Sequence, residues 1–142
     1  MSGLYVDGEL QTNIIVPTEI TEIMHATLYG YEKLESITIH DGITSIGERA
    51  FCDCNSLTSV TIGNSVTSIG KEAFYYCKLS SVTIPKNVVS IGSRVFYQSK
   101  ALQYIYMLPE TPPSRSSTNV FTINDETKIG VPINSLNEYK TN

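Results

Sequence analysis

The stretch Leu57–Gly70, LTSVTIGNSVTSIG, decides the fold because both halves of it recur along the chain. Its first six residues return as LESITI at Leu34–Ile39 and as LSSVTI at Leu79–Ile84. Its last five residues return as ITSIG, ending at Gly47, and as VVSIG, ending at Gly92. A small apolar residue followed by Phe comes next in each copy: Ala50-Phe51, Ala73-Phe74 and Val95-Phe96. A unit of about 23 residues at a fixed spacing predicts a solenoid, in which each coil contacts only its neighbours.

Apolar and small polar residues alternate over the first six positions of each copy, and this period of two predicts a short strand with one buried face. The inward side chains would be Ile37, Ile39, Val60, Ile62, Val82 and Ile84. The outward side chains would be Ser36, Thr38, Ser59, Thr61, Ser81 and Thr83. The block that ends in Ser-Ile-Gly predicts a second extended segment that turns at its glycine. The Phe pair then predicts a turn or a single helical turn that places a ring in the core.

The repeat extends in degenerate form on both sides of these copies. Residues Ile14–Leu28 fit the frame as a first coil, and Leu102–Met107 opens a last coil that soon departs from it. One coil buries too little apolar surface to offset the entropy of ordering its backbone. Stacking about five coils would pair the backbone groups and bury both sides of each apolar layer. The expected fold class is therefore an α/β solenoid of short strands with turns or single-turn helices, capped at both ends.

The chain of 142 residues is long enough for one continuous core, so we expect a single domain over residues 1–142. Residues 1–10 are predicted to form an N-terminal hairpin cap with Asp7-Gly8 at its turn. Residues 11–108 would hold the repeats, and residues 109–142 would form a C-terminal cap.

Several features of the C-terminal segment support that cap. Pro109, Pro112 and Pro113 interrupt the strand pattern, and residues 114–119 are predicted to be a polar loop. A Phe returns at Phe121, and residues 129–132 are predicted to be a closing strand. Ser135 and Glu138 match a capping box, which predicts a short helix that carries Tyr139.

Composition excludes two classes of partner. The net charge is −4 and the Lys and Arg residues are scattered, so no basic stripe is available to neutralise the phosphates of a nucleic acid. No apolar run approaches the roughly 18 residues that membrane insertion requires. Residues Met1–Leu4 have neither the charged start nor the apolar stretch of a signal peptide.

The sequence offers no arrangement for catalysis, and we expect a non-enzymatic protein without a cofactor. The two histidines are His25 and His40, and no nucleophile lies at a strained turn such as G-x-S-x-G. The acidic residues are scattered along the repeats, so they favour a solvated surface over a pair of catalytic carboxylates.

Three cysteines raise the question of a metal or a disulfide. Cys52 and Cys54 are separated by one residue, whereas zinc ligands are usually spaced by two to four, and a fourth ligand is lacking. Cys54 and Cys77 share one repeat position, which Tyr31 and Ser99 occupy in other copies. The pattern therefore favours buried free thiols and no metal site, with a disulfide between the stacked cysteines as the alternative.

The outward strand face is the candidate binding surface, because repeats create long and regular surfaces. Tyr104 and Tyr106 lie on it in the last coil, and tyrosine is enriched in binding hot spots. The candidate partner-binding residues are Ser36, Thr38, Ser59, Thr61, Ser81, Thr83, Tyr104 and Tyr106. The alternative is that these hydroxyl groups form only a solvated sheet surface, since Thr and Tyr favour strands in any case. A second column, Tyr29, Tyr75 and Tyr97, is expected to pack against the turns.

The combined pattern L-x-x-[IV]-T-I, [IV]-x-S-I-G and [AV]-F resembles the BspA-type leucine-rich repeat, over roughly residues 11 to 140. The segment from Thr111 to Lys140 is similar to the one that ends many arrays of this family. The first coil departs from the pattern, with Gln11 at the Leu position and Met24 at the Gly position.

The resemblance implies a right-handed leucine-rich-repeat solenoid on a bacterial surface or secreted protein, with a role in adhesion and protein binding. The implied partner is a protein or glycan on a host or neighbouring cell surface. We therefore expect a module that recognises this partner through the extended strand face. The alternative is a structural spacer that positions another domain and binds nothing itself, since both functions are compatible with one fold.

Overall fold

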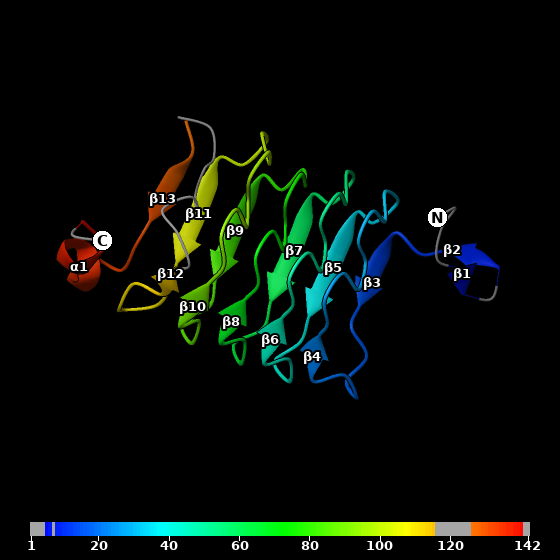
Figure 1. The fold of residues 1–142 in the computed structure, drawn as a ribbon, viewed down its shortest axis with the longest axis horizontal. Helices are drawn as coiled ribbons and strands as arrows, with labels where there is room; N and C mark the ends of the chain where they lie inside the picture. The colour runs from blue at the N-terminus through cyan, green and yellow to red at the C-terminus, as the bar shows by residue number, and fades with distance from the viewer. Residues whose placement is uncertain (1–4, 7, 116–125, 141–142) are drawn as a thin grey trace.

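Each coil contributes one strand to each of two rows of parallel strands, which lie on either side of the core (Figure 1). The computed structural model describes residues 5–6, 8–115 and 126–140. One row consists of β3 (Asn13–Ile15), β5 (Ser36–Ile39), β7 (Ser59–Ile62), β9 (Ser81–Ile84), β11 (Tyr104–Met107) and β13 (Lys128–Gly130). The other row consists of β4 (Glu22–Ile23), β6 (Ser45–Ile46), β8 (Ser68–Ile69), β10 (Ser90–Ile91) and β12 (Ser114–Arg115). The predicted solenoid of about five coils is confirmed.

Equivalent repeat positions lie side by side in neighbouring coils. Ile46 pairs with Ile69, and Ile69 pairs with Ile91, in the five-stranded sheet. The six predicted inward residues of the longer strands are buried, except Val60, which is half-buried. The prediction that apolar side chains form layers in register is therefore confirmed.

Three phenylalanine rings form the centre of the core. Phe51 and Phe74 stack with ring centroids 5.3 Å apart, and Phe74 and Phe96 stack at 5.9 Å. All three side chains have no exposed surface. Because Phe74 has a ring on each side, it contributes to two layers at once.

The segment that carries each Phe is a turn, not a helical turn, and it contains two residues with left-handed backbone. In the second coil these are Arg49, with φ of 55°, and Asp53, with φ of 60°. Side chains other than Gly rarely adopt this conformation. Here alternate N–H groups point at the next coil: Arg49 donates to Lys71 O at 2.9 Å, and Asp53 donates to Tyr75 O at 2.9 Å. These hydrogen bonds offset the backbone strain.

The glycine after each short strand is required by a close approach between coils. A Cβ atom added to Gly70 would lie 2.4 Å from the backbone nitrogen of Glu48. The sequence predicted a turn at this glycine, and the structure adds the physical reason for the residue type. Two backbones meet here at a distance that leaves no room for a side chain.

The N-terminal segment forms the predicted hairpin, from β1 (Tyr5–Val6) and β2 (Glu9–Leu10), with antiparallel pairing. Gly8 has φ of +82°, as expected at such a turn. The hairpin lies beyond β3 at one end of the solenoid (Figure 1), and its role as a cap stays a prediction. The first coil borders a hollow of about 310 Å³, lined largely by apolar residues that include Ile14 and Leu28.

The C-terminal segment differs in part from the sequence prediction. The prediction of a polar loop was wrong at Ser114 and Arg115, which form β12, because the edge of β10 pairs with them. Residues 116–119 and Phe121 lie outside the described residues. The closing strand is confirmed as β13, which pairs with β11.

The predicted terminal helix is confirmed, with a short 3₁₀ helix in front of it. The 3₁₀ helix η1 covers Ile133–Ser135, and the helix α1 covers Leu136–Lys140. The Tyr139 hydroxyl donates to Pro109 O at 2.7 Å, so the helix is fastened to the end of the last coil. No helix in the described part of the chain is long and apolar enough to cross a membrane.

We predict that Phe74→Ala lowers the free energy of unfolding by about 3–5 kcal/mol, because it opens a cavity between two stacked rings. Thr61→Ala, an exposed strand position in the same region, should change it by less than about 0.5 kcal/mol. Urea unfolding of the two variants measures both values. Equal losses would mean that the assigned layers are wrong.

Candidate binding face

The outward side chains of the longer strands form one surface, which we call the strand face. It carries Ser36, Thr38, Ser59, Thr61, Ser81, Thr83, Tyr104 and Tyr106, which all lie on the same side of these strands. All of them are exposed except Ser36, which is half-buried. The structure therefore brings together the residues that the sequence selected.

Equivalent residues of the strand face form rungs across neighbouring strands. Ser36 pairs with Ser59, and Thr38 pairs with Thr61, between β5 and β7. Between β9 and β11, Ser81 pairs with Tyr104 and Thr83 pairs with Tyr106 in the same way. The face thus changes from short hydroxyl side chains to large rings as the array proceeds toward its C-terminal end.

Tyr104 and Tyr106 form the most developed part of the strand face. Their rings stack with centroids 6.0 Å apart and an angle of 9° between the planes. Their exposed fractions are 39% and 45%. Lys128 on β13 places its Nζ atom 5.8 Å from the centre of the Tyr104 ring, within the range of a cation–π interaction. The two rings are therefore held in a fixed position while much of their surface stays accessible.

The strand face extends beyond the predicted residues at both edges. Asn13 on β3 accepts a hydrogen bond of 2.6 Å from the Ser36 hydroxyl, and the neighbouring Ile15 is 75% exposed. Sequence reasoning missed these residues because the first coil is degenerate. It missed Lys128 because the closing strand was expected to begin at Ile129. The alternation of exposed and buried positions, continued one residue earlier, was the available signal.

The strand face is divided between β7 and β9. These strands lie side by side (Figure 1), but they belong to two separate three-stranded sheets. The step from Leu57 to Leu79 is 22 residues, whereas the other steps between equivalent Leu residues are 23. The shorter step accounts for the interrupted ladder, which the sequence pattern of a regular array did not predict.

A charged group lies outside the strand face, on the turns that carry the Phe residues. The Arg49 Nε atom donates to Glu72 Oε2 at 2.7 Å, and Arg94 Nη1 lies 3.6 Å from Glu72 Oε1. Glu72 is only 6% exposed. The hydrogen bond from Arg49 lowers the pKa of Glu72, although burial acts against it. The carboxylate therefore links three successive coils.

The cysteines are buried free thiols. Cys54 Sγ donates to Leu28 O at 3.2 Å, and Cys77 Sγ donates to Phe51 O at 3.3 Å. Burial raises the pKa of Cys54 to about 12 and that of Cys52 to about 11. Ser99, at the same repeat position, donates to Phe74 O at 3.0 Å. The position therefore needs a small hydrogen-bond donor, which explains why Cys and Ser alternate there.

The histidines have structural surroundings. His40 is hydrogen-bonded through both ring nitrogens to backbone groups, with Pro17 O at 3.0 Å and Gly42 N at 2.9 Å. His25 is exposed. Within residues 8–115 and 126–140, no group of three or more His, Cys, Asp or Glu side chains is arranged to hold a metal ion.

The fold and the repeat pattern are matched by one family model. The BspA type leucine rich repeat region, in six copies, matches residues 9–137. The chain belongs to this family. A comparison with curated proteins found no match.

Solved structures of leucine-rich repeat proteins from bacteria are similar to this BspA-type domain. A leucine rich repeat protein from T. pallidum superposes with a TM-score of 0.67 at 21% identity, over 84% of this chain and 51% of its own. A leucine rich cell surface protein from Faecalibacterium prausnitzii gives a TM-score of 0.74 at 21% identity, over 90% of this chain and 34% of its own. A leucine-rich repeat protein from Bacteroides capillosus gives 0.61 at 28% identity, over 68% and 77%. The chain thus spans about half and a third of the first two proteins.

We predict that Glu72→Gln removes part of the pH dependence of folding. The pKa of Glu72 is lowered in the folded state, so its contribution to stability is complete above the ordinary pKa of about 4.3. It is lost as the pH falls through the lowered folded value. The difference in unfolding free energy between parent and variant should therefore shrink as the pH falls from 7 to 3. A constant difference over that range would contradict the assigned ion pair.

Proposed function

We propose that this BspA-type domain is a non-enzymatic binding module of a bacterial cell-surface or secreted protein, with a role in adhesion. The strand face would recognise a protein partner through many contacts at once. The stacked pair Tyr104 and Tyr106, held beside Lys128, is the observation that carries the proposal. Rings that are fixed before binding lose little conformational freedom on binding.

The backbone supports this use of the strand face. Parallel pairing of β9 with β11 and of β11 with β13 fixes the spacing of the exposed side chains. A partner would therefore meet a surface that needs no rearrangement. The description of the F. prausnitzii protein as a cell surface protein supports the proposed location.

We predict that the double variant Tyr104→Ser with Tyr106→Thr binds at least tenfold more weakly than the parent. It gives β11 the residues that β9 has at the paired positions, Ser81 and Thr83, so the fold should be retained. Loss of two aromatic hot-spot residues is worth about 1.4 kcal/mol for each tenfold change in affinity. The measurement is binding of the labelled domain to a panel of extracellular proteins and intact cells.

The matched control is Tyr29→Ser, which removes a tyrosine that is 50% exposed but lies on the turn of the first coil. This variant should bind like the parent. If the folded double variant also keeps full binding to every partner that the parent recognises, the strand face is not the binding site. If the parent recognises none of the panel, the spacer function is favoured.

A further inference from the structure

One missing residue distinguishes a single coil from its neighbours. Two residues separate the buried donor position from the next Leu in the other coils: Tyr31 to Leu34, Cys54 to Leu57, and Ser99 to Leu102. Lys78 alone lies between Cys77 and Leu79. Its N–H donates across to Leu57 O at 3.0 Å, whereas Asn55 N–H bonds within its own turn, to Asp53 O at 2.9 Å. The turn at Lys78 is therefore shorter and tighter than those beside it.

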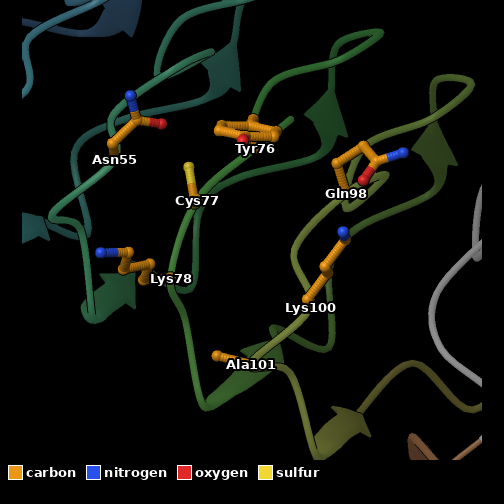
Figure 2. A pocket seen from close by; sticks show the side chains of 7 residues that line it. All are labelled: Asn55, Tyr76, Cys77, Lys78, Gln98, Lys100 and Ala101. Atoms are coloured by element: carbon orange, nitrogen blue, oxygen red, sulfur yellow. The ribbon is translucent and has the colours of Figure 1, made fainter.

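The tight turn leaves a pocket of about 480 Å³ between the two longer turns that flank it. Figure 2 shows Tyr76 and Cys77 in the middle, Asn55 to one side, and Gln98 and Lys100 to the other. Lys78 and Ala101 complete the lining. The volume falls within the range of small-molecule sites, about 300–1,000 Å³. The pocket lies at the end of the coils where β9 and β11 begin, next to the strand face but separate from it.

The lining is basic and polar, although the chain as a whole is acidic. Lys78 and Lys100 are both exposed, and no Asp or Glu is among the lining residues. The ring of Tyr76 is 48% exposed. Other coils have Gly30, Asp53 or Gln98 at this left-handed position, so the ring is an addition that the backbone does not require. The pocket thus combines positive charge with one accessible aromatic surface.

The wall of the pocket also contains an unsatisfied acceptor. Asn55 Oδ1 is buried, and among the described residues it has no hydrogen-bond partner. Buried polar atoms are nearly always paired, so an unpaired one needs an explanation. A hydroxyl group on a ligand is a donor that would satisfy it. The amide of Gln98 offers a second donor and acceptor pair on the opposite side.

We propose that this pocket binds an acidic sugar, a pyranose ring that bears a carboxylate. Its hydroxyl groups would bond to Asn55 and Gln98, its apolar ring face would cover Tyr76, and its carboxylate would lie near the two lysines. A simple carboxylate supplies neither hydroxyl donors nor a ring face. A neutral sugar leaves the lysines without a counter-charge. The site is independent of the proposed function, because it uses none of the strand-face residues.

The test is an NMR titration of the ¹⁵N-labelled domain with methyl glucuronoside and, separately, N-acetylneuraminic acid. At least one of them should give saturable shifts of the Tyr76, Lys78 and Gln98 amides. Methyl glucoside and acetate should each bind at least tenfold more weakly. Failure of both acidic sugars to shift these amides would overturn the proposal. Equal binding of methyl glucoside or of acetate would overturn it too.

The sharpest variant inserts one Ser between Lys78 and Leu79, which restores the two-residue spacing of the other coils. It keeps every lining residue and fills the space that the short turn leaves, so sugar binding should fall at least tenfold. Tyr76→Gln, which copies the next coil, and Lys78→Gln test the chemistry without changing the turn. Unchanged affinity in these two substitution variants would overturn the proposal, even if the insertion variant does not fold. The double variant at Tyr104 and Tyr106 should keep the sugar site, and loss of binding there would place the site on the strand face instead.

Discussion

Backbone hydrogen bonds between successive coils are the constraint on which the rest of the structure depends. Each turn that carries a Phe donates alternately within its own coil and to the next one, as Cys52 N–H does to Arg49 O and Phe51 N–H does to Ala73 O. The short strands donate in the opposite direction, as Gly70 N–H does to Ile46 O at 2.8 Å. Every interior coil is therefore bonded on both sides. The stacked rings and the close approach at Gly70 follow from the spacing that these bonds impose.

Much of this architecture could be predicted from the sequence because the apolar pattern repeats. The alternation over residues 57–62 predicts a strand and its buried face, and the recurrence of Phe predicts a stack of rings. The left-handed residues could not be predicted, because Arg49 and Asp53 are unlike Gly and have this conformation only through hydrogen bonds to the next coil. Of the candidate face, the exposed residues were predicted. The division between β7 and β9 was missed, since it depends on one absent residue.

The parts of the molecule that bind others are separate from the parts that hold it together. Side chains on the strand face can change from Ser81 to Tyr104 at paired positions because the backbone ladder carries the fold. A turn can likewise lose a residue at Lys78 while the Phe stack continues past it, from Phe74 to Phe96. We infer that variation in this solenoid produces function in two ways. Substitution changes the flat face, and deletion opens a pocket between coils.

Native-state hydrogen exchange of the bonds between coils tests the central claim most directly. If the coils form one continuous ladder, the amides of Phe51, Phe74 and Gly70 should exchange only through global unfolding. Their exchange free energies should then be equal to one another and to the unfolding free energy measured with urea. Exchange of these amides at rates near those of an unstructured peptide would contradict the account.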